Sequence, residues 1–141
     1  MIKNYYKMFP EQKFAIVKFQ SETLSFQEAE RINYEYKSDI DYSKIQYLLI
    51  IIEDKCIPTF NPRDIENLAN LYNTESQTNN HKTIVWLIAA PLVTALTQLF
   101  VSRTNDNSFY CSTVHNAYDL LNIPMEFADF KRLINNPNQK L

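Results

Sequence analysis

Short apolar runs alternate along the chain with longer segments in which apolar residues recur at helical spacing. The runs at residues 13–19, 47–52 and 83–89 are rich in β-branched and aromatic residues, which is typical of strands. The run at 47–52 has no polar alternation, which favours a parallel strand covered on both faces. Residues 109–111 predict a further short strand, and residues 4–8 predict an antiparallel partner for the first run.

The segments between these runs predict amphipathic helices. Ser25 and Glu28 match a capping box, in which a hydroxyl and a carboxylate each satisfy a free backbone N–H at a helix start. Asn61 followed by Pro62 is a second start signal, with a cap before proline at the first helical position. Three further helices are expected to begin at Pro91, after Ser112 or Thr113, and near Phe127.

The order of these elements predicts an α/β fold, because strands separated by helices require right-handed crossovers. We expect a mainly parallel four-stranded sheet with an N-terminal antiparallel edge strand and helices packed on both faces. No repeat or boundary divides the chain, so residues 1–135 are expected to form a single domain and residues 136–141 a frayed tail. Residues 73–80 contain no apolar residue and predict an exposed loop.

The composition excludes several classes of chemistry. The chain has 141 residues and no glycine, which excludes glycine-rich phosphate loops, dinucleotide fingerprints and nucleophile elbows. The net charge is −2, with an excess of lysine in residues 1–20 and of acidic residues in residues 21–41. No basic stripe with interleaved aromatic residues is present, so a nucleic-acid partner is not expected.

Targeting and redox signals favour a cytoplasmic protein. The chain opens without the apolar block of a secretory signal, and both cysteines, Cys56 and Cys111, lie beside apolar runs. We therefore expect reduced, semi-buried thiols. The longest apolar run, residues 84–93, is half the length of about 20 residues that a membrane-spanning helix needs, so membrane insertion is not expected.

Three stretches carry a resemblance to a known family. They are the strand and its acidic end at residues 48–54, the lead of residues 81–83 into Trp86, and residues 112–118. Together with the element order, they resemble a STAS domain, the fold of anti-sigma-factor antagonists and of the cytoplasmic tails of sulphate transporters. The likeness covers roughly residues 5–125 and is nearer to bacterial STAS-like proteins.

The resemblance implies a non-enzymatic protein-interaction or regulatory module. The antagonists carry a regulatory serine in an Asp-Ser-Ser-Gly turn, but here Pro62 or Arg63 stands at that position. A phosphoserine switch is therefore not expected, and Thr59 is the nearest residue that can be phosphorylated. The resemblance further implies a protein partner, or a second copy, that contacts the start of the helix opened by Asn61 and Pro62. The polar contacts would come from Thr59, Asn61, Arg63, Asp64 and Glu66.

A small-molecule or lipid-binding module is the alternative. Ligands of open parallel sheets bind beyond the carboxyl ends of the strands. An apolar or anionic ligand would there meet Phe60 and Trp86, together with the helix cap at Ser112 and Thr113, whose free N–H groups suit an anion.

Two constellations suit catalysis in residue type but not in arrangement. Glu53 and Asp54 are adjacent on a strand end and are therefore expected to point to opposite sides. Cys111 and His115 lie in different predicted elements, with Asp119 one turn beyond. No cysteine or histidine pair has metal-ligand spacing. We expect no catalytic residue, no metal and no cofactor.

Overall fold

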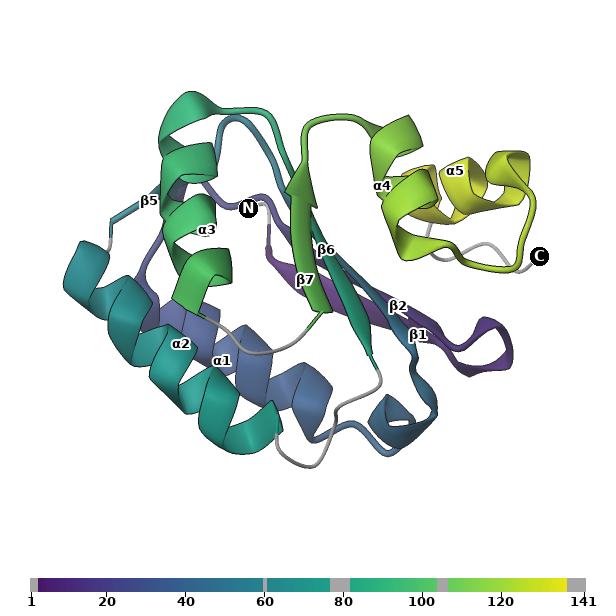
Figure 1. The fold of residues 1–141 in the computed structure, drawn as a ribbon, viewed down its shortest axis with the longest axis horizontal. Helices are drawn as coiled ribbons and strands as arrows, with labels where there is room; N and C mark the ends of the chain where they lie inside the picture. Colours follow the sequence, from purple (N-terminus) through teal and green to yellow (C-terminus); the bar gives the residue numbers. More distant parts are fainter. Residues whose placement is uncertain (1–2, 60, 77–81, 104–106, 137–141) are drawn as a thin grey trace.

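The computed structural model describes residues 3–59, 61–76, 82–103 and 107–136 (Figure 1). The strands are β1 (Tyr5–Phe9), β2 (Phe14–Phe19), β3 (Thr23–Leu24), β4 (Tyr47–Ile52), β5 (Ile57–Pro58), β6 (Thr83–Ile88) and β7 (Asn107–Cys111). The α-helices are α1 (Phe26–Lys37), α2 (Pro62–Ser76), α3 (Pro91–Arg103), α4 (Val114–Leu121) and α5 (Phe127–Asn135). Two short 3-10 turns, η1 (Pro10–Gln12) and η2 (Tyr42–Lys44), precede β2 and β4.

The main sheet has the strand order β1-β2-β4-β6-β7. β1 pairs antiparallel with β2, from Tyr5 opposite Lys18 to Phe9 opposite Phe14, and the other three pairings are parallel. The α/β class and the antiparallel edge strand are therefore confirmed. The expected count of four strands is not confirmed, because the sheet has five strands in all.

Helices cover both faces of this sheet. The strands after β1 follow one another across the sheet, so the crossover helices α1, α2 and α3 all pack on the same face. Helices α4 and α5 pack on the opposite face, as the two sides of Figure 1 show. Leu48, Ile50 and Ile52 of β4 enter the first core and Leu49 and Ile51 the second. Burial on both faces explains why β4 is a continuous apolar run.

Several predicted boundaries are corrected by the structure. Helix α2 continues to Ser76, so the expected loop at 73–80 begins at least four residues too early, and the rest of it lies outside the described residues. The last turn of α2 is polar, so the pattern of apolar residues predicted a loop there. Backbone hydrogen bonding does not require apolar side chains, and the helix therefore continues through this turn. Helix α5 ends at Asn135, and most of the predicted tail at 136–141 lies outside the described residues.

Two residues take over the role that glycine usually has in turns. Lys13 follows η1 with φ 56°, and Asn122 ends α4 with φ 53°. Both lie in the left-handed region, which favours glycine because a Cβ atom crowds the following carbonyl there. Asparagine tolerates this conformation well, whereas lysine is an uncommon choice.

Candidate functional site

A separate two-stranded sheet, formed by β3 and β5 beyond the carboxyl ends of the main sheet, immediately precedes the predicted interface in the chain. The two-residue strands β3 and β5 pair in parallel, a pairing that the sequence did not predict. Ile57 donates its N–H to the carbonyl of Glu22 at 3.0 Å, and Thr59 donates its N–H to the carbonyl of Leu24 at 2.9 Å. The Thr59 hydroxyl donates to the same carbonyl at 3.3 Å. The segment before α2 is thus attached to the segment before α1.

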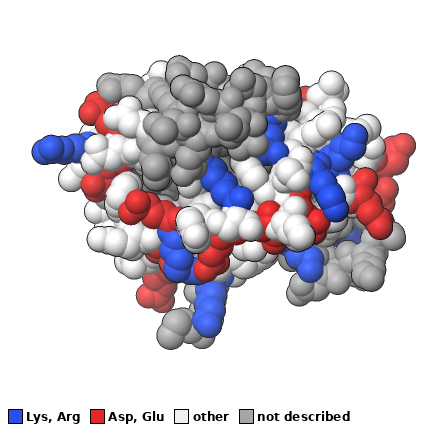
Figure 2. Space-filling view, turned by 90° about the horizontal axis from the view of Figure 1, so that it is seen from below, with Lys and Arg blue, Asp and Glu red and all other residues white. Residues whose placement is uncertain are grey.

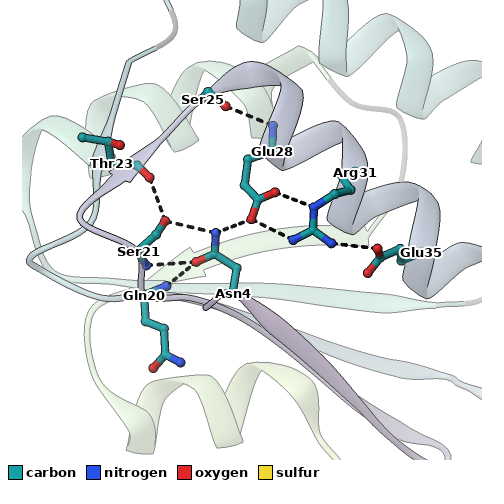
Figure 3. Close-up of polar contacts among 8 residues, drawn as sticks. All are labelled: Asn4, Gln20, Ser21, Thr23, Ser25, Glu28, Arg31 and Glu35. Atoms are coloured by element: carbon teal, nitrogen blue, oxygen red, sulfur yellow. Dashed lines mark hydrogen bonds and ion pairs between the residues drawn. The ribbon is translucent and has the colours of Figure 1, made fainter. Parts of the chain in front are cut away.

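The segment before α1 is itself held by a buried amide (Figure 3). Asn4 is only 6% exposed, and its Oδ1 accepts the backbone N–H groups of Gln20 at 2.7 Å and Ser21 at 3.0 Å. Its Nδ2 donates to Ser21 Oγ at 3.0 Å and to Glu28 Oε2 at 2.9 Å. One side chain therefore joins the start of β1, the end of β2 and the first turn of α1.

Glu28 extends these contacts along α1. Its Oε2 accepts from Arg31 Nη2 at 2.8 Å, and Arg31 Nη1 donates to Glu35 Oε1 at 2.7 Å. The hydrogen bonds from Arg31 and Asn4 lower the pKa of Glu28, against the opposing effect of partial burial. We call Asn4, Ser21, Glu28 and Arg31 the Asn4 network.

The predicted capping box is only half formed. Ser25 Oγ accepts the N–H of Glu28 at 3.1 Å, as expected. The Glu28 carboxylate is instead engaged by Asn4 and Arg31. A capping box occurs at the start of α2, where Asn61 Oδ1 accepts the N–H of Asp64 and Asp64 Oδ2 accepts the N–H of Asn61, both at 3.0 Å.

The residues predicted to contact a partner lie between β5 and the first turns of α2, and the structure adds the exposed Ile57 just before them in sequence. We define the β5–α2 surface as Ile57, Thr59, Asn61, Arg63, Asp64 and Glu66. Ile57 is 56% exposed, and Thr59, Asn61 and Arg63 are exposed beside it in sequence. Phe60 lies outside the described residues. An exposed aliphatic side chain with a polar surround has the make-up of a small protein interface.

An apolar cavity of about 60 Å³ lies between the sheet and the three helices α1, α2 and α3. Trp86 lines it, as do Val17, Ile50, Leu68 and Val93. Three polar side chains at its wall are hydrogen-bonded within the protein: Thr97 Oγ1 donates to the carbonyl of Val93 at 2.8 Å, and the Tyr36 hydroxyl donates to Asn33 Oδ1 at 2.8 Å. The cavity therefore suits a small uncharged molecule.

Trp86 and Ser112 do not share a pocket. Ser112 lines a separate groove of about 240 Å³ at the carboxyl ends of the strands, together with Lys18, Glu53 and Asp54. Both acids of the predicted pair thus border this groove, and Glu53 forms an ion pair with Lys18 at 3.1 Å. The ligand site expected from the sequence is therefore divided between two hollows on opposite sides of the sheet.

Thr113 has a structural task at the start of α4. Its Oγ1 accepts the N–H of Asn116 at 3.1 Å, which makes it the N-cap. This hydrogen bond uses one of the N–H groups that the sequence offered to an anion. The sequence left the cap open between Ser112 and Thr113, and the structure assigns it to Thr113.

The structure does not join Cys111 to His115. Within the described part of the chain, Cys111 Sγ bonds only to the carbonyl of Thr113, at 3.6 Å, while His115 Nε2 lies 3.4 Å from Asp119 Oδ2. Burial raises the pKa of the Cys111 thiol, the opposite of what an activated nucleophile needs. The described residues contain no group of three His, Cys, Asp or Glu side chains that could hold a metal ion.

Sequence reasoning missed Asn4 and Lys82. Lys82 is buried, and its ammonium donates to the carbonyls of Tyr42, at 2.9 Å, and Ile45 and lies 4.3 Å from the centre of the Tyr42 ring. Burial lowers its pKa. Both residues look like ordinary polar surface positions in the sequence, since their partners are 16 or more residues away.

Charges of both signs are mixed on the face shown in Figure 2, where Lys and Arg side chains lie among Asp and Glu. Ion pairs among the described residues include Arg31 with Glu35 at 2.7 Å and Lys44 with Asp41 at 3.3 Å. In the described part of the chain, no helix has the length and apolar character needed to cross a membrane.

Comparison of the chain with family models, with curated proteins and with solved structures found no match.

Proposed function

We propose that this protein is a non-enzymatic, STAS-like interaction or regulatory module that binds a protein partner through the β5–α2 surface. The observation that carries the proposal is the exposure of Ile57, an aliphatic side chain that is 56% exposed two residues before Thr59. Fully burying an exposed isoleucine side chain contributes about 1.5–3 kcal/mol, and the 56% of Ile57 that is exposed would contribute roughly half of that against a partner. The polar residues around it, led by Arg63, would select the partner by charge.

The rigidity of the surface supports this proposal. β3 holds the backbone of Ile57 and Thr59, the Asn4 network holds the segment before β3, and the Asn61–Asp64 caps fix the first turn of α2. A surface that is ordered before binding loses less conformational entropy when the partner docks. Asn61 and Asp64 therefore act mainly by shaping the surface, and Ile57 and Arg63 are free to make the contacts.

The proposal includes the absence of a phosphoserine switch and a place in the cytoplasm. Pro62 and Arg63 stand where the antagonists carry the serine, and Pro62 is the first residue of α2. The two cysteines are free thiols, Cys56 buried and Cys111 partly buried. Free thiols suit a reducing compartment.

Substitutions within the β5–α2 surface, compared with one outside it, test whether this surface binds the partner. Ile57→Lys and Arg63→Glu are expected to reduce the amount of partner that co-purifies from the native cells at least about tenfold, since each replaces a proposed contact with an unmatched charge. Ile40→Lys is the matched control, because Ile40 is 89% exposed and lies outside the β5–α2 surface. Circular dichroism and thermal unfolding verify that all three variants keep the fold. Equal partner recovery with all variants would refute the proposal.

A second candidate function is the binding of a small apolar molecule, and the cavity beside Trp86 favours it. Its volume of about 60 Å³ is well below the roughly 150 Å³ of an engineered cavity that binds benzene. The cavity therefore admits a very small apolar molecule or the end of an alkyl chain.

Xenon and a cavity-filling variant test this second function. Xenon under pressure is expected to raise the melting temperature of the wild-type protein, because a ligand that binds only the folded state stabilises it. Val93→Ile places one more methylene in the cavity and should abolish this effect. Val85→Ile adds the same group in the other core and should preserve it. An unchanged melting temperature under xenon would exclude the cavity as a ligand site.

A further inference from the structure

β7 forms an edge of the main sheet. It pairs with β6 on one side, and among the strands of the described residues none lies beyond it in the sheet order. Figure 1 looks onto this edge, with β7 in front of β6 and no helix in front of β7. The outer side of an edge strand carries backbone N–H and C=O groups that can pair with another strand.

The β7 edge lacks the features that usually prevent such pairing. Edge strands are commonly protected by charged side chains, by proline or by a bulge. β7 reads Asn-Ser-Phe-Tyr-Cys, with no charge and no proline, and its register with β6 runs without a bulge. The opposite edge, β1, has the exposed side chain of Lys7 at its centre.

Exposed aromatic side chains lie on both faces of β7. Phe109 is 39% exposed and pairs in register with Val85, which belongs to the core under α4 and α5. Tyr110 is 38% exposed and pairs with Trp86, which packs against the other core. Each face of the edge therefore offers one aromatic ring, and aromatic cross-strand pairs stabilise adjacent strands.

The helix α3 beside β7 carries no charged residue before its last one, Arg103. Helix α3 contacts β7, and residues 83–102 contain no Asp, Glu, Lys or Arg, although these make up 21% of the chain. The exposed side chains of α3 include Ala95, which is small, and Gln98, which is polar but uncharged. Depletion of charge together with exposed aromatic residues distinguishes interface centres from the remaining surface.

We propose that two copies of this chain pair through their β7 strands, antiparallel about a two-fold axis, so that the two five-stranded sheets join. A second copy fits this edge because a two-fold axis places the same strand opposite itself in the antiparallel sense. Each copy then supplies matching backbone donors and acceptors. The uncharged stretch of α3 from Pro91 to Ser102 also adds no like-charge repulsion when two copies of a chain with net charge −2 meet.

This pairing does not depend on the β5–α2 surface. β5 belongs to the separate two-stranded sheet, and none of the residues of the β5–α2 surface lies on β7 or α3. Substitutions at Ile57 or Arg63 are therefore expected to leave self-association unchanged. Substitutions on β7 are expected to leave partner binding by a single copy unchanged, so the two proposals fail independently.

Sedimentation equilibrium of the purified chain tests the proposal. We expect a dimer at about 100 µM, a concentration that fills an interface of micromolar affinity. Phe109→Lys and Tyr110→Lys should each raise the dimer dissociation constant at least about tenfold, because a two-fold axis brings both new charges together. Ile40→Lys is the control for an added surface lysine and should leave the constant unchanged. A wild-type monomer, or a dimer that survives both β7 variants, overturns the proposal.

Hydrogen exchange of the wild-type chain provides a second measurement if the lysine variants fail to fold. Backbone amides of residues 107–111 should exchange more slowly at about 100 µM than at about 1 µM, because pairing protects them. Amides of β1, the other edge, should exchange equally at both concentrations. Concentration-independent exchange in β7 contradicts the proposal, as does protection by concentration in β1 instead.

Discussion

Asn4 is the residue on which the candidate site depends most. All four hydrogen-bonding positions of its amide are used, two by backbone N–H groups and two by the side chains of Ser21 and Glu28. An amide side chain can donate two hydrogen bonds and accept two, whereas a carboxylate only accepts and a hydroxyl has a single donor. Through them the first strand, the end of β2 and the start of α1 are fixed relative to one another.

We therefore predict that Asn4→Ala lowers the free energy of unfolding by about 1–3 kcal/mol, because the partly buried N–H groups of Gln20 and Ser21 lose their acceptor. Urea titration followed by circular dichroism measures the change. Gln20→Ala is the control: its side chain makes an exposed hydrogen bond to the carbonyl of Lys3, so its effect should stay within about 0.5 kcal/mol. Similar effects of the two substitutions would contradict the role given to Asn4.

Glu28 makes the stability of this network depend on pH. Arg31 and Asn4 hold its pKa in the folded protein below the ordinary value of 4.5, so the stabilising contribution is complete above that pH and is lost as the pH falls through the folded pKa. The stability difference between the wild type and Glu28→Gln should therefore be largest at neutral pH and shrink on acidification.

Urea titrations between neutral pH and about pH 3 measure this dependence. Glu11→Gln, in the exposed turn η1, corrects for the loss of one negative charge. If the difference in free energy of unfolding between the wild type and Glu28→Gln stays constant with pH, or grows in acid, the ion pair of Glu28 with Arg31 does not stabilise the folded protein.

At the scale of elements, turns in this chain are built without glycine. Lys13 adopts φ 56° between η1 and β2, and its carbonyl accepts the N–H groups of Gln46 and Tyr47 at 2.8 and 3.0 Å. These bonds align β2 with β4 at the start of their pairing, where Phe14 lies opposite Tyr47. The left-handed conformation costs a residue with a Cβ atom roughly 1–2 kcal/mol, so Lys13 is a strained position.

Lys13→Gly should accordingly raise the free energy of unfolding, by roughly 0.5–1 kcal/mol once the greater freedom of glycine in the unfolded chain is subtracted. Lys7→Gly is the matched control in β1, where extended backbone makes glycine unfavourable, and it should lower stability by a similar amount. Thermal unfolding of both variants distinguishes them. Destabilisation by Lys13→Gly would show that the lysine side chain, and not its backbone, stabilises this turn.

The elements that sequence predicts well are those fixed by local pattern. The strand at 47–52 and the helices begun by Asn61–Pro62 and Pro91 start where expected, because apolar spacing and capping are local signals. The β3–β5 pairing and the Asn4 network could not be found in this way, because each joins residues far apart in the chain. The prediction of one ligand pocket lined by both Trp86 and Ser112 is wrong for the same reason. The sequence gives the order of residues along the strands, but it does not tell which residues from distant segments enclose each hollow.

At the scale of the whole molecule, the sheet separates the surfaces that we assign to different tasks. The β5–α2 surface lies beyond the carboxyl ends of the strands, and the β7 edge closes one side of the sheet. The other face of the sheet is covered by α4 and α5, and Cys111 of β7 packs against the core beneath them. A protein with this arrangement can bind a partner while two copies remain joined through β7.

The most direct test of the proposed function is native mass spectrometry of the protein isolated from its own cells. We predict a complex that contains a second, different protein at a fixed ratio to this chain, and that disappears for Ile57→Lys but persists for Ile40→Lys. The exposed Ile57 side chain is then accounted for by partner binding. Detection of this chain alone, either single or paired with itself, would contradict the claim that the β5–α2 surface binds a protein partner.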